Sequence, residues 1–153
     1  MINPHYQFPG TGQWAYRSFL NDPNLSHDLV YENNTYCPEF GQGTLNIVTN
    51  VDGTLTGTIG GEGWQLTLAG SVQTGNPATL WFRGSGIVSG SQWIYDYLCY
   101  VVPHIPEGID QVPALVGSVT RAITHPNGSG GTSPAGVVAS FFAVHQVLAT
   151  GKK

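Results

Sequence analysis

The feature that most constrains the fold is a tryptophan near the start of the chain and an arginine near its end, with strand-like segments between them. Trp14 follows Gly12-Gln13 on the first such segment, and Arg121 lies on the seventh of eight. If the sheet closes on itself, the two side chains can meet, with the guanidinium stacked on the indole. We therefore expect a closed barrel that Trp14 and Arg121 seal at one end, leaving the other end open to a ligand.

Eight segments alternate apolar and polar residues, as strands with one buried face do. Turn residues such as Asp52-Gly53 separate them. The expected strands are 13–20, 44–50, 54–59, 64–73, 79–88, 92–102, 114–124 and 135–147. Mostly short connections favour an up-and-down meander, and closure removes the exposed sheet edges.

The prediction is an all-β, single-domain, closed antiparallel eight-stranded barrel over residues 1–153. Residues 1–11 are expected to form an N-terminal arm, 21–42 a long loop and 148–153 a tail.

Composition excludes several classes of function. Charged residues make up 9% of the chain and the formal net charge is −4. With so few cations and no basic stripe, the chain is not expected to bind nucleic acid. No stretch approaches the roughly 18 consecutive apolar residues of a membrane span, and no hydrophobic segment opens the chain. We therefore expect a cytoplasmic protein with no membrane partner.

Cofactor and metal signatures are missing from the sequence. No His-x-His, His-Glu-x-x-His or Cys-x-x-Cys spacing occurs. The two Gly-Ser-Gly stretches have no following helix to complete a phosphate site. Two cysteines, Cys37 and Cys99, are too few for a disulfide scaffold and are expected to be free thiols. We expect no metal and no cofactor.

Gly12-x-Trp14, the late Arg121 and the eight meandering strands resemble the calycin superfamily of lipocalins, fatty-acid-binding proteins and avidins. Residues 43–59 are similar to the second and third strands of avidin-like proteins. In avidin-like proteins this hairpin ends in an aromatic residue that lines the biotin site, whereas this chain has Ile59 there. The later Trp and Asp positions of that family also have no match here. The resemblance implies a calycin-like barrel and does not extend to biotin binding.

Parity along each strand predicts which side chains face inward. If Trp14 points inward, so do Tyr16 and Ser18. Two segments, 92–102 and 135–147, are apolar on both faces, and the inward face of the first is left open by parity. A barrel has one interior, so another copy of the chain is the expected cover for the second apolar face. We therefore expect a homodimer or a larger homo-oligomer.

Candidate site residues are the few polar or aromatic groups that could face the interior. The ligand-binding candidates are Tyr16, Trp81, Arg83, Tyr95, Tyr97 and Arg121. Arg121 is either the structural plug on Trp14 or a deep anchor for the ligand. Arg83 joins the cavity only if Trp81 does; if Phe82 is in the core, Arg83 is solvated.

Three further residues are candidates for acid–base catalysis: Asp96, His104 and His125. Each histidine adjoins a proline at a strand end, where it is either a solvated loop residue or an acid–base group at the barrel rim. Asp96 lies between two tyrosines and is either exposed, or buried and paired with an arginine or tyrosine.

An apolar and aromatic lining with a few polar anchors is how small-molecule cavities are built. The sequence therefore predicts a barrel that holds a small apolar or aromatic metabolite. It could also be a cofactor-free isomerase, cyclase or decarboxylase, since some calycin-like barrels, allene oxide cyclase among them, are enzymes. The alternative is a partner-protein or chaperone-like module whose interior is filled by side chains.

Overall fold

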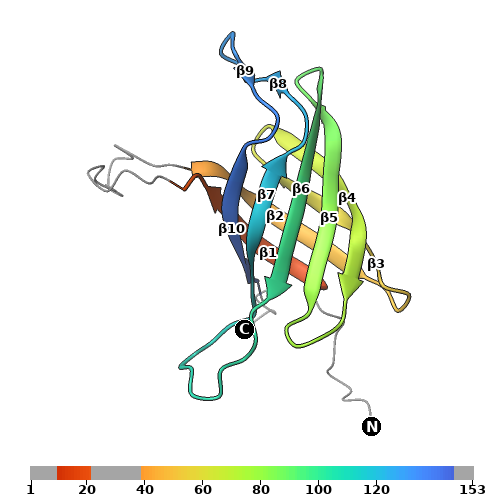
Figure 1. The fold of residues 1–153 in the computed structure, drawn as a ribbon, viewed down its shortest axis with the longest axis vertical. Coiled ribbons are helices and arrows are strands. Elements are labelled where there is room, and N and C mark those ends of the chain that lie inside the picture. Colours follow the sequence, from red (N-terminus) through yellow and green to blue (C-terminus); the bar gives the residue numbers. More distant parts are fainter. Residues whose placement is uncertain (1–9, 22–38, 147–153) are drawn as a thin grey trace, which may run out of the picture.

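The computed structural model describes residues 10–21 and 39–146 and folds them into a closed antiparallel β-barrel (Figure 1). The predicted fold class is confirmed. The barrel strands are β1 (Gly12–Phe19), β2 (Glu39–Thr49), β3 (Thr54–Gly61), β4 (Trp64–Gln73), β5 (Thr79–Val88), β6 (Ser91–Val101), β7 (Ala114–Arg121) and β10 (Val138–His145). Each pairs with the next, and β10 closes the barrel against β1. Among these residues there is no helix that could cross a membrane.

Strand alternation places the apolar residues inside, as parity predicts. Leu45, Ile47, Leu55 and Ile59 of the β2–β3 hairpin are buried, and Asn46 and Thr56, which alternate with them, are exposed. On β6 the inward face is the one with Trp93, Tyr95, Tyr97 and Cys99. Cys99 is a free, buried thiol, and Cys37 lies outside the described residues.

The β2–β3 turn forms as its Asp-Gly sequence predicts. Asp52 accepts hydrogen bonds from the backbone nitrogen and the hydroxyl of Thr54, at 3.0 and 2.7 Å. Gly53 takes a φ of +90°, which an L-residue with a side chain adopts only at a cost. These hydrogen bonds hold the pKa of the exposed Asp52 below its usual value, the backbone bond to Thr54 contributing most.

Two predicted connections differ from the structure. β2 begins at Glu39, so residues 39–42 are strand rather than the end of the predicted long loop. The reason is pairing with β1, which continues as far as Phe19 across a bulge. The glycine-rich stretch 126–134 contains a small ribbon, in which β8 (His125–Pro126) pairs with β9 (Thr132–Ser133).

Trp14 and Arg121 lie at opposite ends of the barrel, so the predicted stacking of Arg121 on Trp14 is wrong. Trp14 lies in register with His145, whose ring meets the indole edge-on at 4.9 Å between centroids. Its indole Nε1 donates to the carbonyl of Gly10 at 2.8 Å. Arg121 is seven residues along β7 from Ala114, about 23 Å at 3.3 Å per residue, and so lies at the other end.

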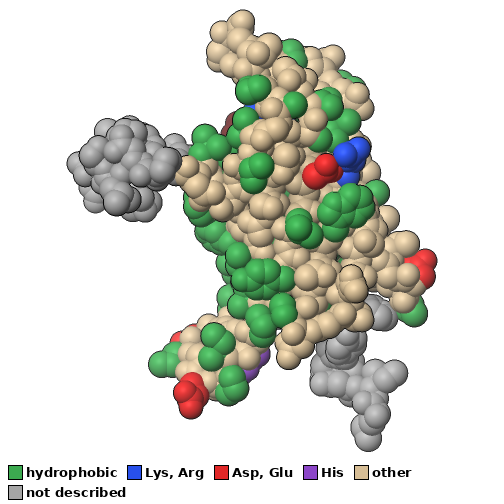
Figure 2. Space-filling view, in the orientation of Figure 1, with side chains coloured by type: hydrophobic (Ala, Val, Ile, Leu, Met, Phe, Trp, Pro, Cys, Tyr) green, Lys and Arg blue, Asp and Glu red, His purple; other side chains and the backbone are tan. Residues whose placement is uncertain are grey.

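The outer face of β5, β6, β7 and β10 carries apolar side chains, which Figure 2 shows gathered most densely toward its lower part. Its exposed large apolar residues are Trp81, Ile87, Leu98, Tyr100, Val138 and Phe142. Arg83 and Asp96 form an ion pair on this face, with Nε to Oδ1 at 2.7 Å and Nη2 to Oδ2 at 3.0 Å. The carboxylate of Asp96, by hydrogen bond and charge, raises the pKa of Arg83.

Candidate functional site: a cavity at one end of the barrel

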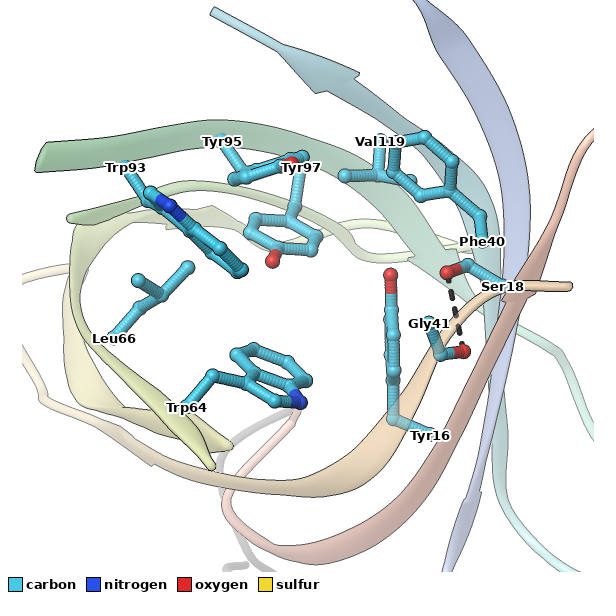
Figure 3. Close-up of a pocket in the computed structure, with 10 residues that line it drawn as sticks. All are labelled: Tyr16, Ser18, Phe40, Gly41, Trp64, Leu66, Trp93, Tyr95, Tyr97 and Val119. Carbon is cyan, nitrogen blue, oxygen red and sulfur yellow. Dashed lines mark hydrogen bonds between the residues drawn. The ribbon is translucent and has the colours of Figure 1, made fainter. Parts of the chain in front are cut away.

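A cavity of about 260 Å³ occupies the end of the barrel opposite Trp14. It lies where β1 and β7 end and where β2, β4 and β6 begin (Figure 3). Ten residues line it: Tyr16, Ser18, Phe40, Gly41, Trp64, Leu66, Trp93, Tyr95, Tyr97 and Val119. Six of them are aromatic, so the walls are flat and largely apolar.

Glycines on β5 leave room for the backbone and the leucine side chains of β4 beside the cavity. Gly84 lies in register with Tyr95, and Gly86 with Trp93. A Cβ added to Gly84 would come within 3.1 Å of a methyl carbon of Leu68, and one added to Gly86 within 2.8 Å of a backbone carbonyl. Larger residues at these two positions would therefore push into the wall beside the cavity.

Aromatic rings pack around Tyr97, one of the residues that line the cavity. Tyr97 stacks on Phe82 with centroids 4.9 Å apart and an interplanar angle of 15°. Tyr16 and Phe141 each meet the Tyr97 ring edge-on, at 6.1 and 5.9 Å. Because all four residues are buried, their ring orientations are fixed by contact on several sides.

Two tyrosine hydroxyls in this wall stay protonated near neutral pH. Desolvation raises the pKa of Tyr97 well above its ordinary value, and neighbouring Tyr16 adds to the shift. Desolvation likewise raises the pKa of Tyr16, although the Ser18 hydroxyl opposes part of that change. In Figure 3 the Tyr97 hydroxyl points into the middle of the cavity. It is therefore a neutral hydrogen-bond donor toward whatever lies there.

A third tyrosine belongs to a hydrogen-bonded cluster at the cavity wall. The Tyr95 hydroxyl lies 2.7 Å from His125 Nε2, and Arg121 Nε donates to it at 2.9 Å. His125 Nδ1 is 2.8 Å from the carbonyl of Pro126, which can only accept, so Nδ1 carries the ring proton. If the ring is neutral, Nε2 is then the acceptor and the Tyr95 hydroxyl donates to it.

Other contacts hold this cluster in place. The His125 ring is buried and stacks on Trp93, with centroids 4.2 Å apart. The Arg121 guanidinium lies over the rings of Phe40 and Tyr95, at 4.9 and 5.7 Å. Its Nη1 donates to the carbonyl of Pro134 at 3.1 Å, which ties the cluster to the connection that carries β8 and β9.

The cavity contains few other polar groups. Ser18 Oγ donates to the carbonyl of Gly41 at 3.3 Å. The indole Nε1 of Trp93 is buried and has no hydrogen-bond acceptor among the residues that the structure describes. No three of the described His, Cys, Asp and Glu side chains come together as a metal site would need.

The sequence-predicted candidates fall in three places. Tyr16, Tyr95 and Tyr97 line the cavity, and Arg121 and His125 bond the hydroxyl of Tyr95. Trp81, Arg83 and Asp96 lie on the outer face, because Phe82 takes the inward position on β5 and Tyr95 and Tyr97 take those on β6. His104 is exposed in the connection from β6 to β7, at the other end of the barrel.

Several lining residues are not among the sequence candidates. Parity places Trp64 and Leu66 inside and leaves the face of Trp93 open, and inward apolar side chains in a barrel are usually core and carry no separate signal of a cavity. Phe40 could not be found, since it lies in a stretch that reads as a polar loop. Burial of His125 depends on the β8–β9 ribbon, whose two-residue strands have no alternation to detect.

Comparisons with protein-family models, with curated proteins and with solved structures find no match to this chain. Function is therefore inferred from the shape and chemistry of the cavity.

Proposed function

We propose that the barrel binds a small, mainly apolar molecule with an aromatic ring, oriented by tyrosine hydroxyls. The observation that carries the proposal is an unfilled cavity with six aromatic residues in its walls, at one end of an otherwise packed barrel. A partner-protein module with a filled interior, the alternative from sequence, does not account for this space.

The size of the cavity limits the ligand. An engineered apolar cavity of roughly 150 Å³ holds benzene, so about 260 Å³ suits one or two fused rings with small substituents. Burying an aromatic group of about 200 Å² contributes roughly 5 kcal/mol at 25 cal/mol per Å² before association costs. After those costs we expect micromolar to millimolar affinity for a simple ring system.

The polar groups set a preference within that size class. Tyr97 can donate to an oxygen in the middle of the cavity, and Tyr16 adds a second protonated phenol. A ligand with a hydroxyl or carbonyl should therefore bind more tightly than its hydrocarbon counterpart. A cofactor-free isomerase, cyclase or decarboxylase remains a second candidate, favoured by the Tyr95–His125 hydrogen bond.

The test compares 2-naphthol with naphthalene by ligand-observed NMR titration. We expect 2-naphthol to bind more tightly than naphthalene by about one hydrogen bond, or roughly 1 kcal/mol. Tyr97→Phe should remove most of that preference, and Tyr100→Phe, on the outer face, should retain it. Failure of both compounds to bind, or the same preference in Tyr97→Phe, would contradict the proposal.

We also propose that copies of the chain associate through the outer face of β6 and β10. Leu98, Tyr100 and Phe142 are exposed there, and burial of such a patch favours association. Sedimentation at tens of micromolar should give a dimer or larger species, and a monomer would refute this.

Cytoplasmic location and calycin-like ancestry stay predictions. The up-and-down meander with Trp14 inside supports calycin-like ancestry, whereas the position of Arg121 does not.

A further inference from the structure

We infer that Tyr95 transfers protons to and from an enolisable carbonyl compound held in the cavity, with His125 and Arg121 as its positioning residues. The inference rests on the proposed binding function and specifies its ligand as a small aromatic or alicyclic ketone with an acidic C–H bond beside the carbonyl. The chemistry is a proton transfer, such as tautomerisation or migration of a double bond.

The first support is the pair of hydrogen bonds on the Tyr95 oxygen. It donates to His125 Nε2 at 2.7 Å and accepts from Arg121 Nε at 2.9 Å. A hydroxyl has two lone pairs, so one remains for a ligand. With the Nδ1 proton directed at the carbonyl of Pro126, Nε2 of a neutral His125 ring can take the phenol proton. Tyr95 is thus a group that can gain one proton as it loses another.

The second support is electrostatic. Arg121 is held over Phe40 and Tyr95 with its Nε directed at the phenol oxygen. A preplaced cation stabilises negative charge that develops on that oxygen as its proton moves to His125. Stacking on Trp93 and burial keep His125 from turning away, so the three groups need little reorganisation during the transfer.

The third support is a hydrogen-bond donor in the same cavity. Tyr97 neighbours Tyr95 on the inward face of β6 and keeps its proton at neutral pH, because burial raises its pKa. It can donate to the ligand carbonyl and to the enolate oxygen that follows. A neutral donor beside a proton acceptor is the pairing that abstraction next to a carbonyl requires.

The step balances without an oxidant or a second reactant. The ligand C–H bond breaks, its proton bonds to the Tyr95 oxygen, and the original phenol proton moves to His125 Nε2. The electron pair left on carbon shifts to form the C=C bond of an enolate, whose oxygen takes the charge and the hydrogen bond from Tyr97. Return of a proton from His125 through Tyr95, to the same carbon or to a conjugated one, restores the neutral residues.

The experiment follows exchange of the C1 protons of 2-tetralone in D2O by NMR, with and without the full chain. We expect the protein to accelerate exchange over buffer. Tyr95→Phe should lower kcat by about 100-fold, the usual contribution of a general acid or base, and leave Kd unchanged. His125→Gln keeps a hydrogen-bond acceptor that cannot be protonated, so it should lower kcat without raising KM. Tyr100→Phe is the matched control.

The outcomes separate this inference from the proposed function. Binding of 2-tetralone without acceleration, or undiminished exchange in both folded variants, overturns the role of Tyr95 and leaves the binding function standing. Failure of both 2-tetralone and 2-naphthol to bind overturns the two together. If Tyr95→Phe does not fold, as judged by circular dichroism, His125→Gln decides the outcome by the same criteria.

Discussion

Replacing Trp14 by phenylalanine should destabilise the barrel without touching the cavity. Trp14 is 2% exposed, and its indole Nε1 donates to the carbonyl of Gly10. Gly10 is also buried. Trp14→Phe leaves that carbonyl without its donor, which costs about 1–3 kcal/mol. It also weakens the edge-on contact with His145, of the kind worth about 0.5–1.5 kcal/mol. The expected loss in the free energy of unfolding is therefore about 2–4 kcal/mol.

Urea unfolding followed by far-ultraviolet circular dichroism measures this loss. Trp81→Phe is the matched control, since Trp81 is 49% exposed on the outer face and its replacement should change stability by under about 0.5 kcal/mol. A double-mutant cycle of Trp14→Phe with Arg121→Gln should be additive within about 0.5 kcal/mol, because the residues lie at opposite ends.

Two results would refute this reasoning. One is a coupling energy between Trp14 and Arg121 above about 1 kcal/mol, which residues in contact show and distant residues do not. The other is a loss in Trp14→Phe no larger than in the Trp81→Phe control.

Three further predictions concern stability and reactivity. Phe82→Ala should cost about 3–5 kcal/mol in urea unfolding, since Phe82 is fully buried and stacked on Tyr97; a cost under about 1 kcal/mol would mean that the ring is not core. Burial raises the pKa of Tyr16 and Tyr97 above the unfolded value of 10.0, so the protonated phenols stabilise the folded state fully below pH 10 and lose this effect as the pH rises further. The midpoint of urea unfolding should therefore shift to lower urea concentration above pH 10, and a midpoint that does not change with pH would contradict this. Burial raises the pKa of Cys99 to about 12, so mass spectrometry should show that iodoacetamide at pH 8 modifies it only after unfolding, and rapid labelling of the folded chain would show an accessible thiolate.

Strand alternation is sufficient to predict the eight barrel strands, whereas closure rests on the pairing of β10 with β1 and not on the predicted contact between Trp14 and Arg121. The predicted bounds of β4 and β5 match the structure, because both strands lie between glycine, asparagine or proline turns. The inward faces of β1 to β4 follow from parity for the same reason. On β6, where both faces are apolar, pairing resolves the ambiguity: Phe82 and Tyr97 lie opposite each other inside the barrel.

The site could be predicted only in part. Parity gives the inward position of Tyr16, but it leaves open whether Tyr95 and Tyr97 face the interior. It also does not give the end of the barrel at which Arg121 meets Tyr95. That position depends on strand register, which places Arg121 opposite Tyr95 and His145 opposite Trp14. Register is set by pairing between strands distant in sequence. Alternation does not determine it, because a shift of two residues leaves every side chain on the same face. Arg83 and Asp96 show the same limit, since a charged pair on one rung is visible only once β5 and β6 are aligned.

The central claim is that a small ring system binds inside the barrel rather than on its apolar outer face. The most direct test is the set of nuclear Overhauser effects between bound 2-naphthol and the protein. The account predicts contacts from the naphthol ring protons to the methyl groups of Leu66 and the indole of Trp93. Contacts to Trp81 and Leu98 on the outer face instead, with none to the cavity residues, would contradict it.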